Sequence, residues 1–349
     1  MSLLTANNLP IPQQPDAQLL AEAARLLDRG ELVAFPTETV YGLGADALNA
    51  DAVARIFAAK GRPAWNPVIV HVADISAARA VTASWPPSAQ RLAEAFWPGP
   101  LTLVLPKHAR IPDVVSAGLD AVAVRVPAHP VALALLRAFG RPIAAPSANR
   151  FTQLSPTTAA HVVNSLGDRV QLIIDGGPCE VGIESTVIDL AGDVPTILRP
   201  GVISREQLDQ ALGATVRIAS PPARAGTNDA ASAPDVGTPQ RSPGMAARHY
   251  APQATVWLLH PGNRDELVDA MTTWNANGPI VALLRSLSLG QRSPHTVVAM
   301  PEEPRDYARA LYAALHAADA TAASLVIIEQ PPDSDAWAGV RDRLTRAAR

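Results

Sequence analysis

Residues 30–72 read GELVAFPTETVYGLGADALNADAVARIFAAKGRPAWNPVIVHV, and this stretch decides the fold. An apolar run at 32–35 enters a polar turn at 36–39, and a helical segment then ends in a Lys-Gly-Arg-Pro turn. A second apolar run follows at 68–72. The order is therefore strand, loop, helix, basic turn and strand, which is typical of an α/β fold.

Polar side chains gather at the ends of these elements. Hydroxyl groups follow the first strand, Lys60 and Arg62 follow the helix, and Asn66 and His71 flank the second strand. Such a set can hold a polar, anionic ligand. A solvated basic turn is an equally good interpretation of Lys60 and Arg62 taken alone.

The composition restricts the class of protein. A chain of 349 residues is long enough for two domains. Net charge is -3, so no global basic field draws it to nucleic acid or anionic lipid. Cys179 is the only cysteine, which excludes an intrachain disulfide and a Cys-rich zinc site. Without a signal-peptide pattern or a membrane-spanning apolar run, we expect a cytoplasmic protein.

A charged side chain stands inside one predicted strand. Residues 121–126 are apolar apart from Arg125, and burying an unpaired cation is costly. Arg125 therefore needs an anion. An internal salt bridge and a bound carboxylate ligand are equally good candidates from this run alone.

Ser155 and Pro156 predict a helix start, with Ser155 as the cap and Pro156 in first position. The free amides of such a start form a phosphate site, although plain capping is the alternative. A strand is expected just before, ending at Ser147 and Asn149. Further helices are expected at 17–29 after the cap Asp16, 76–83, 88–96 and 205–212 after the cap Ser204, and further strands at 101–105, 172–175 and 186–190.

The composition changes after residue 219. Residues 220–243 are rich in Pro, Ala, Ser and Gly and cannot bury enough apolar surface to fold alone, so they predict a linker. Beyond it, four apolar runs alternate with helical stretches at 264–274 and 305–318, which predicts a small parallel α/β domain. The apolar runs lie at 256–259, 280–284, 297–300 and 325–329.

Several motifs, taken together, resemble the YrdC-like family of threonylcarbamoyl-AMP synthases. They are PTETVYGLG at 36–44, KGRPxxNPVIVH at 60–71, VRVP at 124–127, STV at 185–187 and SPGMxxRHYAP at 242–252. The last motif is found in the longer, two-domain members of the family. The resemblance implies an α/β fold: a YrdC-like twisted mixed-sheet catalytic domain at 1–213, a linker folding over the active site at 214–253, and a smaller Rossmann-like parallel α/β domain at 254–349.

The resemblance also implies two sets of binding residues. Those for L-threonine are Thr39, His71, Arg125, Ala145 and Ser185, and those for ATP are Lys60, Arg62, Asn66, Ser147, Ser155, Arg199 and Tyr250. No protein-bound metal is implied, and Mg²⁺ would arrive mainly on the phosphates. One departure is that Phe151-Thr152 stands where the family usually has Ser-Gly, so a looser nucleotide loop is expected here.

The family reaction joins L-threonine, bicarbonate or CO2, and ATP to give threonylcarbamoyl-AMP and pyrophosphate for tRNA modification. It suits the residues, since the chain has no HExxH or GxSxG motif and no paired carboxylates for a metal or a covalent nucleophile. Implied partners are the proteins that transfer the threonylcarbamoyl group to tRNA, with weak or transient tRNA contact and no membrane. The alternatives are a non-catalytic RNA-binding module of the same fold, disfavoured by 4% aromatic content, and a related enzyme using another carbamoyl compound.

Overall fold

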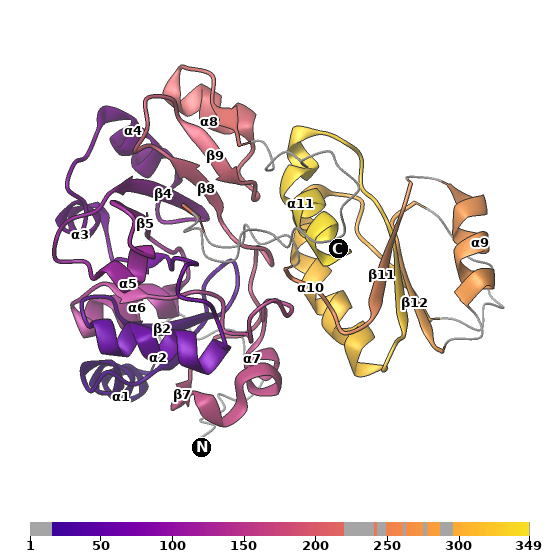
Figure 1. Ribbon diagram of the computed structural model, residues 1–349, viewed down its shortest axis with the longest axis horizontal. Coiled ribbons are helices and arrows are strands. Elements are labelled where there is room, and N and C mark those ends of the chain that lie inside the picture. The colour runs from indigo at the N-terminus through magenta and orange to yellow at the C-terminus, as the bar shows by residue number, and fades with distance from the viewer. Residues whose placement is uncertain are drawn as a thin grey trace, which may run out of the picture.

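The computed structural model describes residues 16–219, 241–242, 249–260, 263–274, 278–286 and 296–348, and builds two α/β units (Figure 1). Their helices are α1 (Ala17–Asp28), α2 (Ala50–Lys60), α3 (Ile75–Ala80), α4 (Pro87–Phe96), α5 (Asp113–Ser116), α6 (Pro130–Phe139), α7 (Ala159–Leu166), α8 (Arg205–Leu212), α9 (Arg264–Trp274), α10 (Pro304–Ala320) and α11 (Ala338–Ala347). The strands of the first unit are β1 (Val33–Phe35), β2 (Gly42–Asp46), β3 (Val70–His71), β4 (Leu101–Pro106), β5 (Ala121–Arg125), β6 (Ile143–Ala144), β7 (Leu172–Ile173), β8 (Thr186–Asp189), β9 (Thr196–Arg199) and β10 (Arg217–Ile218). Those of the second are β11 (Thr255–Leu259), β12 (Ile280–Leu284), β13 (Thr296–Ala299) and β14 (Leu325–Glu329).

The first sheet has ten strands in the order β10-β9-β8-β4-β5-β3-β6-β2-β1-β7, with parallel and antiparallel pairs mixed. Two registers matter for function. Parallel pairing of β3 with β5 sets His71 opposite Arg125, the last residue of each strand. Antiparallel pairing of β8 with β9 brings Arg199 opposite Val187, close to Ser185. The expected twisted mixed sheet is confirmed.

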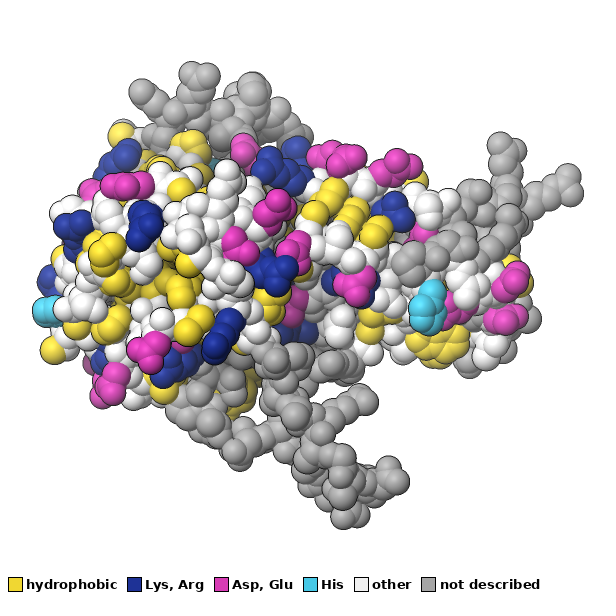
Figure 2. All heavy atoms as spheres, turned by 90° about the horizontal axis from the view of Figure 1, so that it is seen from above, with side chains coloured by type: hydrophobic (Ala, Val, Ile, Leu, Met, Phe, Trp, Pro, Cys, Tyr) yellow, Lys and Arg dark blue, Asp and Glu magenta, His cyan; other side chains and the backbone are white. Residues whose placement is uncertain are grey.

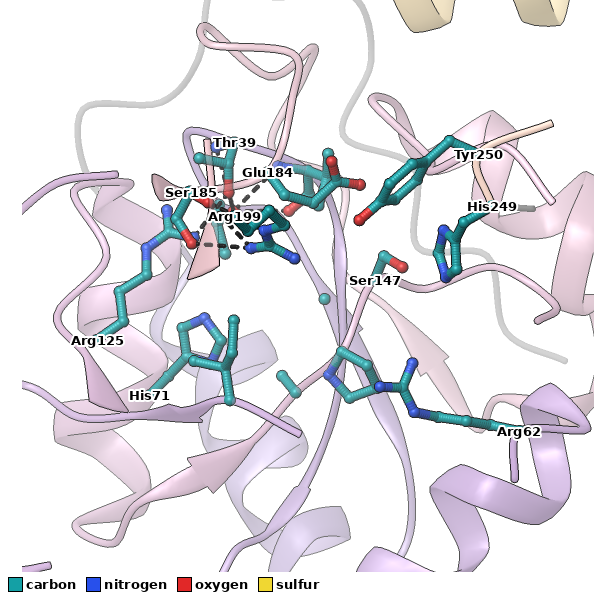
Figure 3. Close-up of a pocket in the computed structure, with 16 residues that line it drawn as sticks. Thr39, Arg62, His71, Arg125, Ser147, Glu184, Ser185, Arg199, His249 and Tyr250 are labelled. Carbon is teal, nitrogen blue, oxygen red and sulfur yellow. Dashed lines mark hydrogen bonds between the residues drawn. The ribbon is translucent and has the colours of Figure 1, made fainter. Parts of the chain in front are cut away.

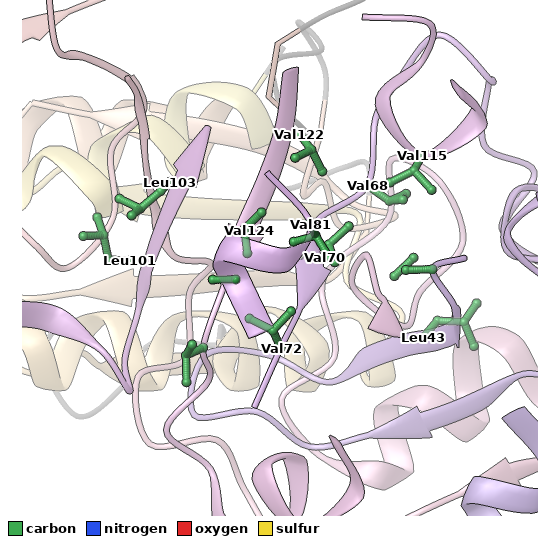
Figure 4. Close-up of a cluster of buried hydrophobic side chains, with 14 of the residues drawn as sticks. Leu43, Val68, Val70, Val72, Val81, Leu101, Leu103, Val115, Val122 and Val124 are labelled. Carbon is green, nitrogen blue, oxygen red and sulfur yellow. The ribbon is translucent and has the colours of Figure 1, made fainter. Parts of the chain in front are cut away.

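Apolar side chains cover both faces of this sheet. On one face, valines and leucines of β3, β4 and β5 pack against α2, α4 and α8 in the largest core (Figure 4). Val70, Val124 and Leu103 in it are fully buried. On the other face, α1 and α6 pack over Val33 and Phe35. Burying both faces fixes the strand ends, and the polar residues that follow those ends are fixed with them.

The second unit is the smaller parallel domain that the apolar runs predicted. Its four strands are all parallel, in the order β11-β14-β12-β13. Helices α10 and α11 cover the face turned toward the first unit, and α9 covers the outer face (Figure 1). The inner core continues into the first unit through Val40, Leu154 and Ile183. The two units therefore share apolar packing.

One predicted helix start is wrong. Helix α7 begins at Ala159, and its cap is Thr158, whose hydroxyl accepts from the His161 amide. Ser155 instead lies in the preceding loop, where its hydroxyl donates to Glu184. Thr158, three residues before the His161 amide, provides the same capping hydrogen bond, so the Ser155 hydroxyl can bond to another partner.

Six elements were not predicted from the sequence, namely β2, β9, β10, α5, α6 and α11. Strand β2 is the most instructive because it reads GLGAD, which is poor in residues that favour strands. A Cβ on Gly44 would lie 2.8 Å from the Phe35 ring, so the glycine is there for close packing against β1. The expected linker at 214–253 lies partly outside the described residues.

Candidate active site

A buried cavity lies where the ends of β1, β3, β5, β6 and β9 meet the loop before β8 and the chain entering the second unit (Figure 3). The empty space between its walls, together with open solvent at its mouth, is about 500 Å³. It is lined by Thr37, Thr39, Val40, Gly42, Arg62, Ile69, His71, Arg125, Ala145, Pro146, Ser147, Glu184, Ser185, Arg199, His249 and Tyr250. Three guanidinium groups thus face one enclosed space, which favours anionic ligands.

The turn after β1 presents its hydroxyls through hydrogen bonds within the turn. Thr37 Oγ1 donates to the carbonyl of Val40 at 2.6 Å and accepts from the Thr39 and Val40 amides. Thr39 Oγ1 in turn accepts from Arg125 Nη1 at 2.9 Å. The small polar residues are therefore held in place before any ligand arrives.

Arg125 forms an internal salt bridge, which was one of the two roles that the sequence allowed for it. Its Nη2 lies 2.6 Å from Glu38 Oε1, and its Nε donates to the carbonyl of Gly99 at 3.1 Å. The hydrogen bonds to Thr39 and Gly99 use two of the five N–H donors. The contact with Glu38 pairs the two charges without the geometry of a hydrogen bond, so the hydrogens of Nη2 and one hydrogen of Nη1 stay available. The ion pair orients Arg125, and a carboxylate ligand can still bind it.

His71 faces the cavity as a neutral imidazole. Burial, and then the charge of Arg125, lowers the pKa of His71 to about 3. Its Nδ1 is buried and has no partner among the described residues. Such an orphaned nitrogen is costly unless a ligand satisfies it.

Arg62 is held by the turn that follows α2. It donates to Asn66 Oδ1 and to the Pro67 carbonyl, both at 2.7 Å, through Nη2. Its Nε donates to the Asn66 carbonyl, so within the described residues Nη1 is left for the cavity. Burial lowers the pKa of Arg62 to about 9, which keeps the side chain charged at neutral pH. Asn66 does not line the cavity but positions Arg62.

Lys60 is buried beneath the loop that carries Ser147. Its Nζ donates to the Ser147 carbonyl at 2.6 Å and to the Asn149 carbonyl. Burial, and then Arg62, lowers the pKa of Lys60 well below its usual value. Lys60 therefore shapes the loop from below and does not line the cavity.

Ser185 and Arg199 form a fixed pair on the opposite wall. Arg199 donates to the Ser185 carbonyl through Nε and Nη2 and to Ser185 Oγ at 3.2 Å. Thr102 and Ser185 share a further hydrogen bond of 2.7 Å. Burial lowers the pKa of Arg199.

Glu184 is the carboxylate that lines the cavity, and it was not predicted. Both its oxygens are engaged, by Ser155 and by Tyr312 and Arg343 from the second unit. Burial raises the pKa of Glu184, but the charges of Arg343 and Arg199 outweigh burial and hold it below the usual value. The carboxylate is therefore ionised and not free to act as a base or metal ligand.

Tyr250 and its neighbour His249 close the cavity from the chain that enters the second unit. Tyr250 is 1% exposed, and His249 stacks edge-on against it and against Phe151. The loop at Phe151-Thr152 is tightly held: the Phe151 amide donates to the Lys60 carbonyl and the Thr152 carbonyl accepts from the Ala251 amide. Thr152 takes the left-handed φ of 68°, which glycine would adopt more easily, and a looser loop than that of the family stays a prediction.

Nine of the twelve predicted site residues line one cavity. Those that do not are Lys60, Asn66 and Ser155, each of which holds a residue or loop that does. Among the residues missed, His249 stands beside Tyr250 in a quoted motif, and Glu184 directly precedes Ser185. A carboxylate between a glycine loop and a buried strand was the available signal for Glu184.

The described residues contain no group of three or more His, Cys, Asp and Glu side chains that could hold a metal ion. They also include no helix long and apolar enough to cross a membrane. Fold and cavity together define a mixed α/β protein whose cavity, lined by cations and hydroxyls, suits small anionic ligands.

Comparisons with known proteins make this class specific. Residues 25–201 match the Sua5/YciO/YrdC family, described as "Telomere recombination", and residues 203–349 match "Threonylcarbamoyl-AMP synthase, C-terminal domain". The chain is 42% identical to the threonylcarbamoyl-AMP synthase of Pyrococcus abyssi over 93% of both chains. It is also 42% identical to that of Bacillus subtilis, over 94% of this chain and 92% of the relative. The crystal structure of P. abyssi Sua5 complexed with L-threonine matches 94% of each chain with a TM-score of 0.84 at 41% identity. The chain therefore belongs to the threonylcarbamoyl-AMP synthase family.

Proposed function

We propose that this protein is a nucleotidyltransferase that converts L-threonine, bicarbonate or CO2, and ATP into threonylcarbamoyl-AMP and pyrophosphate for tRNA modification. The observation that carries the proposal is the single cavity in which Arg62, Arg125 and Arg199 face small hydroxyls, in a chain similar over almost its whole length to synthases of this name.

Threonine would bind at the end of the cavity that holds Arg125. The hydrogens that this guanidinium keeps on Nη1 and Nη2 suit a carboxylate. Thr39 and Ser185 offer hydroxyls, the orphaned His71 Nδ1 can accept a hydrogen bond, and Ala145 borders the ligand with its backbone. A neutral His71 next to Arg125 adds no second positive charge where the substrate brings its own ammonium group.

ATP would bind toward Arg62, Ser147, Arg199 and Tyr250. The guanidinium groups would neutralise the phosphates, and Ser147 and Tyr250 would fix their position. Lys60, Asn66 and Ser155 support this half through the contacts described above. Mg²⁺ would arrive on the phosphates, because Glu184, the lining carboxylate, is already engaged.

The reaction then needs positioning more than a protein nucleophile. The threonine ammonium group first loses one proton to solvent, and the free amine then attacks bicarbonate. Water leaves, which gives N-carboxythreonine. The new carboxylate attacks the α-phosphorus of ATP, the bond to the β-phosphate oxygen breaks, and pyrophosphate leaves. Fixed cations that meet the charge developing on the phosphates, and substrates held in line, supply the catalysis.

Several further features belong to this proposal. The proposed division is 1–213, 214–253 and 254–349. Strand β10, which lies in the second range, pairs with β9 and so extends the first sheet beyond residue 213. The product would pass to the proteins that transfer the threonylcarbamoyl group to tRNA. The reaction would take place in the cytoplasm. Charges of both signs are interspersed on the face in Figure 2, which favours at most weak tRNA contact there.

The test measures pyrophosphate release from ATP by the purified protein with bicarbonate and Mg²⁺, with and without L-threonine. We expect release that requires both threonine and bicarbonate and is slower with L-serine. Folded protein that binds ATP but shows no threonine-dependent release would contradict the proposal. Salt-dependent RNA binding without turnover would then favour the RNA-binding alternative.

A further inference from the structure

An arginine of the second unit, which does not itself line the cavity, contacts residues of the cavity wall. Arg343 lies on α11 and is 1% exposed. Its Nε donates to Glu184 Oε2 at 2.7 Å, its Nη2 to the Glu184 carbonyl at 3.2 Å, and its Nη1 to the Pro200 carbonyl at 2.9 Å. These contacts use all three nitrogens of the guanidinium.

The three segments that Arg343 contacts are distant in sequence but adjacent in the wall. Glu184 precedes Ser185, and Pro200 follows Arg199. By bonding to Glu184 and Pro200, Arg343 therefore fixes the residues next to the Ser185–Arg199 pair. The third segment carries Tyr250, whose ring centre lies 5.1 Å from the Arg343 guanidinium carbon. One buried side chain therefore holds together residues assigned to both substrates.

The surrounding contacts leave Arg343 little freedom to move. A Cβ on Gly339, one turn earlier on α11, would lie 2.5 Å from the Gly201 carbonyl oxygen. A Cβ on Gly182 would lie 2.5 Å from Arg309 Cα on α10. The backbones of the two units thus touch on both sides of Glu184, and Tyr312 donates a third hydrogen bond to that carboxylate at 3.1 Å, beside those from Ser155 and Arg343. Glycine is required at both places for this approach.

The Arg343–Glu184 ion pair also affects the charges inside the cavity. Glu184 lines the same cavity as Arg62 and Arg199, whereas Arg343, 2.7 Å from Glu184, is not part of the cavity lining. Without Arg343, the buried carboxylate would lose its principal counter-charge and would turn toward the cavity cations, because an unpaired buried charge is costly. Arg62 and Arg199 would then be neutralised by the protein and less available to phosphate.

We propose that Arg343 is a positioning residue for the adenylation reaction: it holds Glu184 away from Arg62 and Arg199 and braces Ser185 and Tyr250, so that the second unit completes both substrate sites. This inference rests on the proposed function. It assigns the second unit a defined part in substrate binding, through one guanidinium and its carboxylate partner.

The test is steady-state pyrophosphate release by the full-length Arg343→Met variant. We expect the KM for both ATP and threonine to rise at least fivefold. Simple destabilisation would instead lower the amount of active enzyme, and so kcat, with KM unchanged. Adding Glu184→Gln to Arg343→Met should lower the KM for ATP again, because the freed negative charge is gone. The matched control is Arg341→Met on the same helix, whose arginine contacts Pro331 and Asp333 within the second unit. Its KM values should stay within twofold of the wild type.

Unchanged KM values in folded Arg343→Met would overturn the inference, as would a double variant with no recovery of ATP binding. If Arg343→Met does not fold, Tyr312→Phe removes one hydrogen bond to Glu184 and keeps the ring. Its KM for ATP should then rise about twofold, and an unchanged value would overturn the inference. Failure of the proposed function is distinguishable, because the wild-type protein itself would then show no threonine-dependent release.

Discussion

At the scale of single residues, Arg125 separates the two substrate sites. We predict that Arg125→Ala abolishes threonine binding and largely spares ATP, because the guanidinium lies on the threonine side of the cavity and ATP has its own cations. Losing a charge-assisted contact of about 2 to 5 kcal/mol weakens binding at least about thirtyfold. Calorimetric titration of each substrate measures this.

Two controls make that experiment decisive. Arg141→Ala removes a half-exposed arginine paired with Asp28 and Asp46, away from the cavity, and should leave both affinities unchanged. Since Arg125→Ala leaves Glu38 buried without its partner, Glu38→Gln/Arg125→Ala is the variant to use if the single change unfolds. Equal loss of both substrates would show that Arg125 has another role.

Residue-level prediction from the sequence worked where a motif fixes a strand end. Arg125 was singled out because a charge stands inside a predicted buried strand, and His71 because it is a polar residue of a quoted motif; the register of β3 and β5 then sets them side by side. Glu184 was missed because its importance depends on Arg343, 159 positions further along the chain. A local pattern cannot show which distant group will face a carboxylate.

At the scale of elements, helix α8 offers a clean test of local capping. Ser204 Oγ accepts from the Gln207 amide, and Gln207 Oε1 accepts from the Ser204 amide, which makes a capping box. We predict that Ser204→Ala lowers the free energy of unfolding by about 1 kcal/mol and leaves turnover unchanged, since Ser204 lies outside the cavity. Urea denaturation of both proteins measures the difference.

The comparison variant for this cap is Ser204→Asn, which keeps an acceptor at the same place and should retain most of the stability. A Ser204→Ala protein as stable as the wild type would mean that α8 is held by its packing on α4 alone. The bond from Arg91 on α4 to the Leu212 carbonyl at the end of α8 is part of that packing.

Most elements could be predicted because apolar periodicity and capping residues are local. The four apolar runs after residue 254 became β11, β12, β13 and β14, and helix α9 has the predicted bounds. Strand β2 could not be predicted, because glycine is favoured there by the Phe35 ring of a neighbouring strand. Ser155 was misassigned because its hydroxyl bonds to a distant side chain, Glu184, and not to the backbone amides of a helix start.

At the scale of the whole molecule, buried histidines make stability depend on pH. Burial lowers the pKa of His71 to about 3 and that of His161 to about 4, and it also lowers the pKa of His129, His249 and His316. An unfolded histidine titrates near pH 6.5, so below that pH the unfolded chain binds more protons than the folded protein. Stability is therefore complete above pH about 6.5 and falls as the pH drops toward about 4.

The measurement is the urea midpoint at pH 7.5 and at pH 5.0 at constant ionic strength, and we expect a lower midpoint at pH 5.0. His161 stacks on His316 across the two units with ring centres 3.7 Å apart, so His161→Asn should reduce the difference between the two midpoints. The same midpoint at both pH values would contradict the inferred neutrality of these histidines in the folded protein.

The contact between Arg343 and Glu184 also sets an order of events during synthesis. The ribosome completes the Glu184 segment 159 residues before it adds Arg343. Until then the nascent cavity holds a carboxylate beside its own arginines, with its main counter-charge not yet made. A chain still being translated should therefore bind ATP poorly, and it would acquire the finished site only when the second unit docks.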